Sequence, residues 1–190
     1  MWTVIIFLIR FILGSGAEKC TSLVGPRAYK CIQHLNEIRE LSYSIEIYDK
    51  DSNSKINKPC SDFKKCHEQL KCGVEDGVVK IIEKLISFCD IVEFHQSEAF
   101  EDCDLKLAEK NSTCVGEWNP FPDPVPGDEK KTEEMQKEAC KNFFGKDRCL
   151  EKELTENCGA KIWIQFKKYY LTLNEINEAC ELDETGNIRS

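Results

Sequence analysis

The residues with the greatest chemical potential are twelve cysteines, all of which lie between Cys20 and Cys180. Zinc sites and thiol–disulfide exchange both favour two cysteines separated by two residues. The closest cysteines here are six positions apart, as Cys60 and Cys66 are. An even, widely spaced set is instead typical of proteins that fold in an oxidising compartment. The sequence therefore predicts structural disulfides, with no metal ion and no cofactor.

All twelve cysteines are expected to take part in these bonds, although their spacing leaves the pairing open. The predicted disulfide cysteines are Cys20, Cys31, Cys60, Cys66, Cys72, Cys89, Cys103, Cys114, Cys140, Cys149, Cys158 and Cys180.

The three histidines, His34, His67 and His95, are the candidates for a catalytic base. The run Cys66-His67-Glu68 superficially resembles the histidine helix of secreted phospholipases A2. However, the adjacent cysteine pair, the aspartate and the glycine-rich calcium loop of those enzymes are absent. No Gly-x-Ser-x-Gly elbow is present, and no carboxylate pair stands out for glycoside hydrolysis. We expect no catalytic residue and no enzyme activity, with a hydrolase that uses His67 and Glu68 as a lesser alternative.

The N-terminal residues 1–17 have the composition of a signal peptide. Val4 to Leu13 form an apolar run interrupted by Arg10, and Ser15-Gly16-Ala17 supplies a small-residue cleavage site. A membrane anchor is the alternative, but a spanning helix needs about 20 apolar residues. We predict cleavage after Ala17, secretion to the extracellular space and no stable membrane insertion.

Charge and a glycosylation sequon add two further expectations. The chain carries 34 acidic and 26 basic side chains, a formal net charge of −8, which argues against nucleic acid as a partner. The sequon Asn111-Ser112-Thr113 predicts N-glycosylation of Asn111 in a secreted protein.

Apolar residues recur every three or four positions along most of the chain, which predicts an all-α, disulfide-rich domain of six or seven helices. The predicted helices cover residues 26–48, 60–72, 78–92, 98–110, 130–144, 147–156 and 162–180. We expect a single domain over 18–180, followed by a flexible polar tail over 181–190.

Two segments interrupt the helical pattern. Residues 49–59 are polar and rich in turn-forming residues, which predicts an exposed loop. Residues 117–128 place prolines at 120, 122, 124 and 126. Such a stretch cannot be helical, and we expect it to form a polyproline II strap that joins two parts of the protein. Trp118 would pack this strap onto the core.

The order of the cysteines hints at an internal repeat. Cys60, Cys66, Cys72-Gly73 and Cys89 are followed in the second half of the chain by Cys140, Cys149, Cys158-Gly159 and Cys180. The spacings differ between the two sets. Coincidence in a cysteine-dense helical protein is therefore the simpler interpretation at this stage.

Several short motifs in the C-terminal half carry a family resemblance. They are Cys140-Lys-Asn-Phe-Phe, Cys149-Leu-Glu-Lys-Glu-Leu, Asn157-Cys-Gly and the Cys114-x-x-x-Trp118 spacing. Together with the twelve cysteines, they resemble a nematode-specific family of secreted proteins that is known only as a domain of unknown function, the nineteenth of its series. The resemblance covers about Cys20 to Cys180. It implies secretion and a disulfide-bonded helical domain, and it brings no reaction and no catalytic residues.

The sequence therefore favours a secreted, non-enzymatic domain that recognises an extracellular protein or glycan. The residues 49–59 and 117–128 are the expected recognition loops. The alternative is a carrier that holds a lipid or another apolar molecule behind Ile162, Phe166 and Tyr170.

Overall fold

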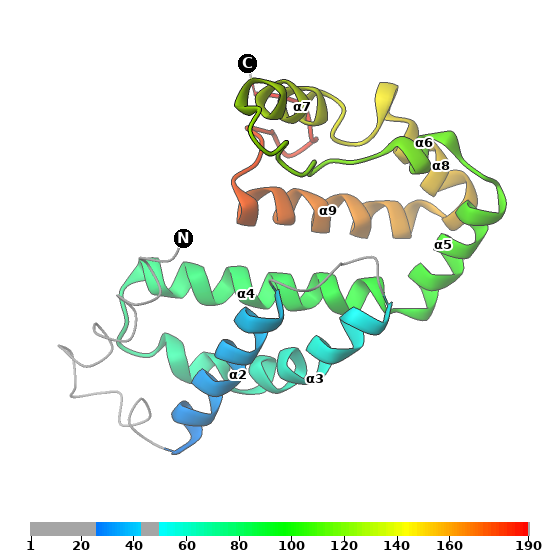
Figure 1. Ribbon diagram of the computed structural model, residues 1–190. Coiled ribbons are helices and arrows are strands. Elements are labelled where there is room, and N and C mark those ends of the chain that lie inside the picture. The colour runs from blue at the N-terminus through cyan, green and yellow to red at the C-terminus, as the bar shows by residue number, and fades with distance from the viewer. Residues whose placement is uncertain (1–25, 43–49, 190) are drawn as a thin grey trace. The chain divides into compact units, whose positions relative to one another are not determined.

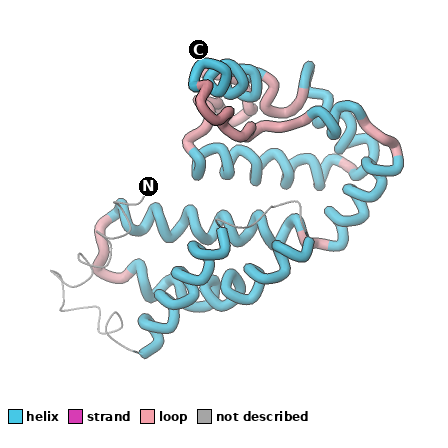
Figure 2. The backbone as a smooth tube through the Cα atoms, viewed as in Figure 1, coloured by secondary structure: helices cyan, strands magenta, loops and turns pink. Residues whose placement is uncertain are grey.

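The computed structural model describes residues 26–42 and 50–189. These residues form eight α-helices and two short 3-10 helices (Figure 1), and no strand appears among them (Figure 2). The all-α prediction is confirmed. The elements are α2 (Pro26–Ser42), α3 (Lys50–Cys66), η1 (His67–Lys71), α4 (Asp76–His95), α5 (Glu98–Glu109), α6 (Thr113–Glu117), α7 (Glu129–Lys141), η2 (Lys146–Arg148), α8 (Cys149–Cys158) and α9 (Ala160–Asn177).

The chain divides into two compact units, Met1–Gln96 and Ser97–Ser190. The second unit begins at Ser97, whose hydroxyl accepts a hydrogen bond from the Phe100 amide at 3.3 Å and caps the start of α5. The segment between α6 and α7, which contains the prolines, lies wholly inside the second unit.

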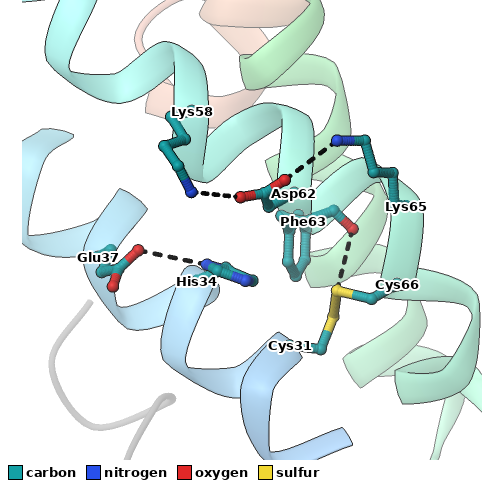
Figure 3. A network of polar contacts seen from close by, with 8 residues as sticks. All are labelled: Cys31, His34, Glu37, Lys58, Asp62, Phe63, Lys65 and Cys66. Carbon is teal, nitrogen blue, oxygen red and sulfur yellow. Dashed lines mark hydrogen bonds and ion pairs between the residues drawn. A yellow bond between two sulfur atoms is a disulfide. The ribbon is translucent and has the colours of Figure 1, made fainter. Parts of the chain in front are cut away.

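In the first unit, α2 and α4 both pack against α3. Two disulfides join these helices: Cys31–Cys66 links α2 to the end of α3, and Cys60–Cys89 links α3 to α4. The Phe63 side chain is completely buried near the first of these bonds (Figure 3). The buried residues of this core are Ala28, Cys31, Ile38, Ile56, Cys60, Phe63, Leu70, Ile82, Cys89 and Val92.

The prediction of an exposed loop over residues 49–59 is wrong, because α3 begins at Lys50 and continues through Pro59. Ile56, Cys60 and Phe63 fall on one helical stripe, and all three are buried. A proline inside a helix costs about 3 kcal/mol. Burial of one large apolar side chain contributes about 1.5–3 kcal/mol, so Ile56 and Phe63 together offset that cost. Tertiary burial therefore decides the structure of a segment whose composition is typical of a loop.

The exposed face of α3 is charged. Hydrogen bonds from Lys58 at 2.9 Å and Lys65 at 3.1 Å reach the two oxygens of the Asp62 carboxylate (Figure 3). These ammonium groups stabilise the ionised form and lower the pKa of Asp62 to about 2. The face that carries them is therefore one that water solvates.

In the second unit, α8 packs against both α5 and α9. Cys103–Cys158 joins α5 to the end of α8, and Cys114–Cys149 joins α6 to its start. A third disulfide, Cys140–Cys180, ties the end of α7 to the chain just beyond α9. The buried residues of α9, which form the main wall of this core, are Ile162, Trp163, Phe166, Tyr170, Leu173 and Asn174.

The residues after α9 fold back as a compact turn, where the sequence predicts a flexible polar tail. Leu182 pairs with Ile188 in an isolated β-bridge, and the Asp183 carboxylate accepts a hydrogen bond from the Thr185 amide at 2.8 Å. Gly186 has a φ of +86°, and a Cβ atom there would lie 2.3 Å from the Phe144 ring. The turn thus needs glycine at a close approach that composition does not reveal.

The Phe63→Ala substitution tests the account of α3. Phe63 is 0% exposed, so its removal leaves a cavity under a helix that already contains a proline. We expect a loss of about 3–5 kcal/mol in the free energy of unfolding. Denaturant unfolding without reductant measures this loss. The control is Lys65→Ala, whose side chain is 70% exposed and whose loss should change stability by less than about 0.5 kcal/mol. Equal effects of the two variants would contradict the account.

Candidate functional site

The structure does not gather the three histidines into one site by any contact among the described residues. The His34 Nδ1 atom lies 3.3 Å from the Glu37 carboxylate on the same helix. His67 lies at the start of η1, and His95 is buried at the end of α4. Each of these histidines therefore has its own local environment.

His67 contacts the carboxylate next to it, as its sequence position allows. Its Nε2 atom lies 2.7 Å from Glu68 Oε1, and its Nδ1 atom lies 2.9 Å from the Lys64 carbonyl oxygen. Lys71 also donates to Glu68 at 3.0 Å, and this hydrogen bond lowers the pKa of the Glu68 carboxyl. Both ring nitrogens of His67 therefore face groups of the protein itself. This arrangement is that of a histidine held in a surface salt-bridge cluster.

The buried His95 makes the first unit sensitive to acid. Burial lowers the pKa of His95 to about 4 from its usual 6.5, since the charged imidazolium loses its hydration. In the unfolded chain the ring binds a proton at higher pH, so stability is complete above pH 6.5 and falls as the pH drops toward 4.

We expect the free energy of unfolding to decrease by about 2 kcal/mol between pH 7 and pH 5 because of His95. In His95→Leu that part of the pH dependence should be absent. Denaturant titrations of both proteins at the two pH values measure the difference. The control is Ile91→Val, a buried residue of the same helix without a titrating group, whose loss of stability should be the same at both pH values. Parallel pH profiles for His95→Leu and the unaltered protein would contradict this assignment.

The most distinctive side-chain arrangement in the second unit is a cluster of aromatic rings around α9. The Phe166 and Tyr170 rings stack with centroids 4.2 Å apart, and Trp118 contacts Tyr170 edge-on at 4.8 Å. Trp163 meets Phe144 edge-on at 5.2 Å. Offset and edge-to-face contacts of this kind stabilise a core beyond simple burial. The cluster therefore offers a closely packed surface against which another segment of the chain can pack.

Residues 118–128, which carry the prolines and follow α6, lie on this cluster, and we call them the proline-rich segment. Trp118 fixes its start, since the indole Nε1–H donates to the Phe143 carbonyl at 2.9 Å. Phe121 meets Phe143 edge-on at 5.7 Å. Near its end, the Val125 amide donates to Thr132 Oγ1 at 2.9 Å. The expected packing of Trp118 onto the core is therefore present.

The first part of the proline-rich segment is covered, since Pro120 is buried, whereas Asp123, Pro124 and Pro126 are exposed. The segment thus combines an exposed stretch with aromatic anchors. Sequence patterns indicated the prolines and Trp118. The partners Phe143 and Thr132 come from positions that no local pattern connects.

The residues expected to line an apolar cavity are core residues. Ile162, Phe166 and Tyr170 are all buried, and the last two stack on each other. Trp118 fills the space beside both rings, with its centroid 5.3 Å from that of Phe166. At the place where a carried molecule was expected, these side chains therefore pack against one another.

Asn111, the expected glycosylation site, is exposed just beyond the end of α5. It has a φ of +50°, in the left-handed region that asparagine tolerates at helix ends. Ser112 begins α6 and accepts a hydrogen bond from the Val115 amide at 3.1 Å. Its hydroxyl also donates to Glu153 on α8. Sequence analysis missed α6, a five-residue helix with no apolar stripe to mark it.

Asn174 is a buried polar residue that the sequence patterns do not indicate. Its amide nitrogen donates to the Cys180 carbonyl at 2.8 Å, and its amide oxygen accepts from the Cys180 amide at 2.9 Å. Both hydrogen bonds position Cys180 for its disulfide with Cys140. The role of Asn174 is therefore to hold the backbone.

Over the part of the chain that the structure describes, no cluster of three or more His, Cys, Asp or Glu side chains has the arrangement of a metal site. No helix within 26–42 or 50–189 combines the length and apolarity that a transmembrane span requires.

These features define a helical protein whose units are each closed by their own disulfides. Comparison with known sequences places it more closely. The family described as "Domain of unknown function (DUF19)" matches residues 20–181. The chain belongs to this family, as the resemblance in its cysteine motifs predicts.

Three relatives from Caenorhabditis elegans are similar over most of their length. UPF0376 protein F10G2.1 is 39% identical over 168 residues, which is 87% of this chain and 83% of the relative. The protein named Excretory canal abnormal exc-13 is 34% identical over 83% of this chain and 79% of its own length. UPF0376 protein C36C5.12 is 33% identical over 90% of this chain and 82% of its own length. No solved structure matches the chain significantly.

Proposed function

We propose that the protein is a secreted, non-enzymatic recognition domain that binds an extracellular protein or glycan through the proline-rich segment. The observation that carries the proposal is the way this segment is held. Trp118 and Phe121 anchor it to the aromatic cluster, and the Val125 amide is bonded to Thr132.

A segment held in this way binds at a lower entropic cost than a free loop, because its conformation is fixed before the partner arrives. Prolines lower this cost further, since each restricts one backbone dihedral. The exposed Asp123, Pro124 and Pro126 then present their side chains and backbone carbonyls to a partner. Residues 49–59, the other expected recognition loop, lie mostly within α3 and are not part of this proposal.

The disulfides support the extracellular location. Five bonds join described cysteines, and disulfides at this density persist in secreted proteins and are rare in the cytosol. Such bonds stabilise a domain in an oxidising environment, where the cysteines stay paired.

The test exchanges the exposed part of the segment for flexible residues. Asp123, Pro124 and Pro126 are replaced together by Gly, Ser and Gly, while Trp118 and Phe121 are kept. The purified secreted protein is applied to a glycan array and to a library of extracellular protein domains. We expect the unaltered protein to bind a member of one collection and the variant to bind it at least tenfold more weakly.

The matched control is Glu133→Ser with Lys137→Ser, which removes an exposed ion pair of 2.7 Å on α7. It should bind as the unaltered protein does, because the pair is exposed to solvent on α7, outside the exchanged residues. Both variants should keep the helical circular dichroism. Undiminished binding by the segment variant, or no binding to either collection, would count against the proposal.

Secretion itself gives a further expected result. In a eukaryotic secreting cell, Asn111 should carry an N-linked glycan, since it is exposed within the sequon Asn111-Ser112-Thr113. The Asn111→Gln protein should then have a lower mass, which differs from that of the glycan-released native protein only by the changed side chain at position 111. Intact-mass measurement of the medium checks this. Equal masses before and after enzymatic glycan release would show that the site is unused.

A further inference from the structure

We propose that the two units are copies of one six-cysteine module, so that the chain carries the same disulfide framework twice in tandem. The boundary between Gln96 and Ser97 leaves six cysteines on each side. In chain order, the first set is Cys20, Cys31, Cys60, Cys66, Cys72 and Cys89, and the second is Cys103, Cys114, Cys140, Cys149, Cys158 and Cys180.

The disulfide connectivity is the same in the two sets wherever both can be compared. The second cysteine pairs with the fourth, as Cys31–Cys66 in one unit and Cys114–Cys149 in the other. The third pairs with the sixth, as Cys60–Cys89 and Cys140–Cys180. These are four bonds that obey one rule.

The remaining pair completes the rule. In the second unit the first cysteine pairs with the fifth, as Cys103–Cys158. In the first unit the fifth cysteine, Cys72, is also in a disulfide. Cys20 lies outside the described residues, and the repeat assigns it to Cys72. Six cysteines allow 15 pairings, so two unrelated sets would agree about once in fifteen cases.

A buried phenylalanine follows the third cysteine in both units. Phe63 lies three residues after Cys60, and Phe143 lies three residues after Cys140. They are 0% and 1% exposed, respectively. Each thus places a buried aromatic side chain three residues beyond the third cysteine of its unit. This agreement concerns packing and is independent of the bonds.

A glycine follows the fifth cysteine in both units and has a positive φ. Gly73 has a φ of +71° and Gly159 a φ of +91°, both in the region that favours glycine. Each glycine precedes the longest helix of its unit, α4 with 20 residues or α9 with 18. The first two cysteines are also 11 positions apart in each set, at 20 and 31 and at 103 and 114.

From the second cysteine onward the spacings are 29, 6, 6 and 17 in the first set and 26, 9, 9 and 22 in the second, and these differences hide the repeat in the sequence. In the first unit, α3 continues from Cys60 to Cys66 without interruption. In the second, the helix ends after Lys141, and a turn precedes α8. Gly145 in this turn has a φ of +81°, and a Cβ there would lie 2.5 Å from Cys149 Sγ. The additional residues in this turn change the spacing of the cysteines but not their pairing.

The experiment uses single substitutions in the full-length secreted protein, followed by alkylation without reduction. Removing one cysteine of a pair leaves the other as a thiol, which the alkylating reagent marks. In Cys20→Ser, the label should appear on Cys72. The matched control is Cys103→Ser, where it should appear on Cys158. A label on another cysteine in Cys20→Ser would overturn the proposal.

A second measurement does not depend on how well those variants fold. The unaltered protein is digested without reduction, and the linked peptides are identified by mass spectrometry. A peptide pair that joins Cys20 to Cys72 is expected. Either cysteine linked elsewhere, or any bond between residues before and after position 96, would overturn the proposal.

Discussion

The structure depends on disulfides that close over short stretches of chain. The bonds between described residues join cysteines separated by 29 to 55 positions. In the chain-entropy description, each such bond destabilises the unfolded state by about 4 kcal/mol. The free energy of unfolding of an ordinary domain is about 5–15 kcal/mol, so each bond contributes a large part of such a total. Units of under 100 residues can therefore fold around modest cores, because the bonds supply what the cores lack.

Helix α7 illustrates this dependence. It has no fully buried residue, and most of its length is charged. Its attachments are the Cys140–Cys180 bond at its end, the Gln136 amide that donates to the Ala179 carbonyl at 3.2 Å, and Thr132 near its start. A helix with so little apolar contact would not remain docked through burial alone. The disulfide holds it, and Asn174 holds the backbone of Cys180 in place.

The aromatic cluster of the second unit gives the proline-rich segment its fixed position. Trp118 belongs to both the cluster and the segment. Its ring packs against Phe166 and Tyr170, and its N–H donates to the Phe143 carbonyl. Phe143 in turn follows Cys140 by three residues. One short stretch of chain therefore connects a disulfide, the core and the exposed surface. A connection of this kind ties the exposed part of the segment to the core.

The sequence by itself determined the helical class, the helices with clear apolar stripes and the oxidising environment that the cysteines need. These properties follow from local periodicity and composition, which each segment carries alone. Only the tertiary structure decided that residues 50–59 are helical and belong to α3, because the burial of Ile56 and Phe63 that stabilises this helix involves other helices. It also decided the pairing of the cysteines. A disulfide forms only where Cα atoms come within about 7 Å, and the observed separations of 5.1 to 6.0 Å arise from helix packing that spacing along the chain does not encode.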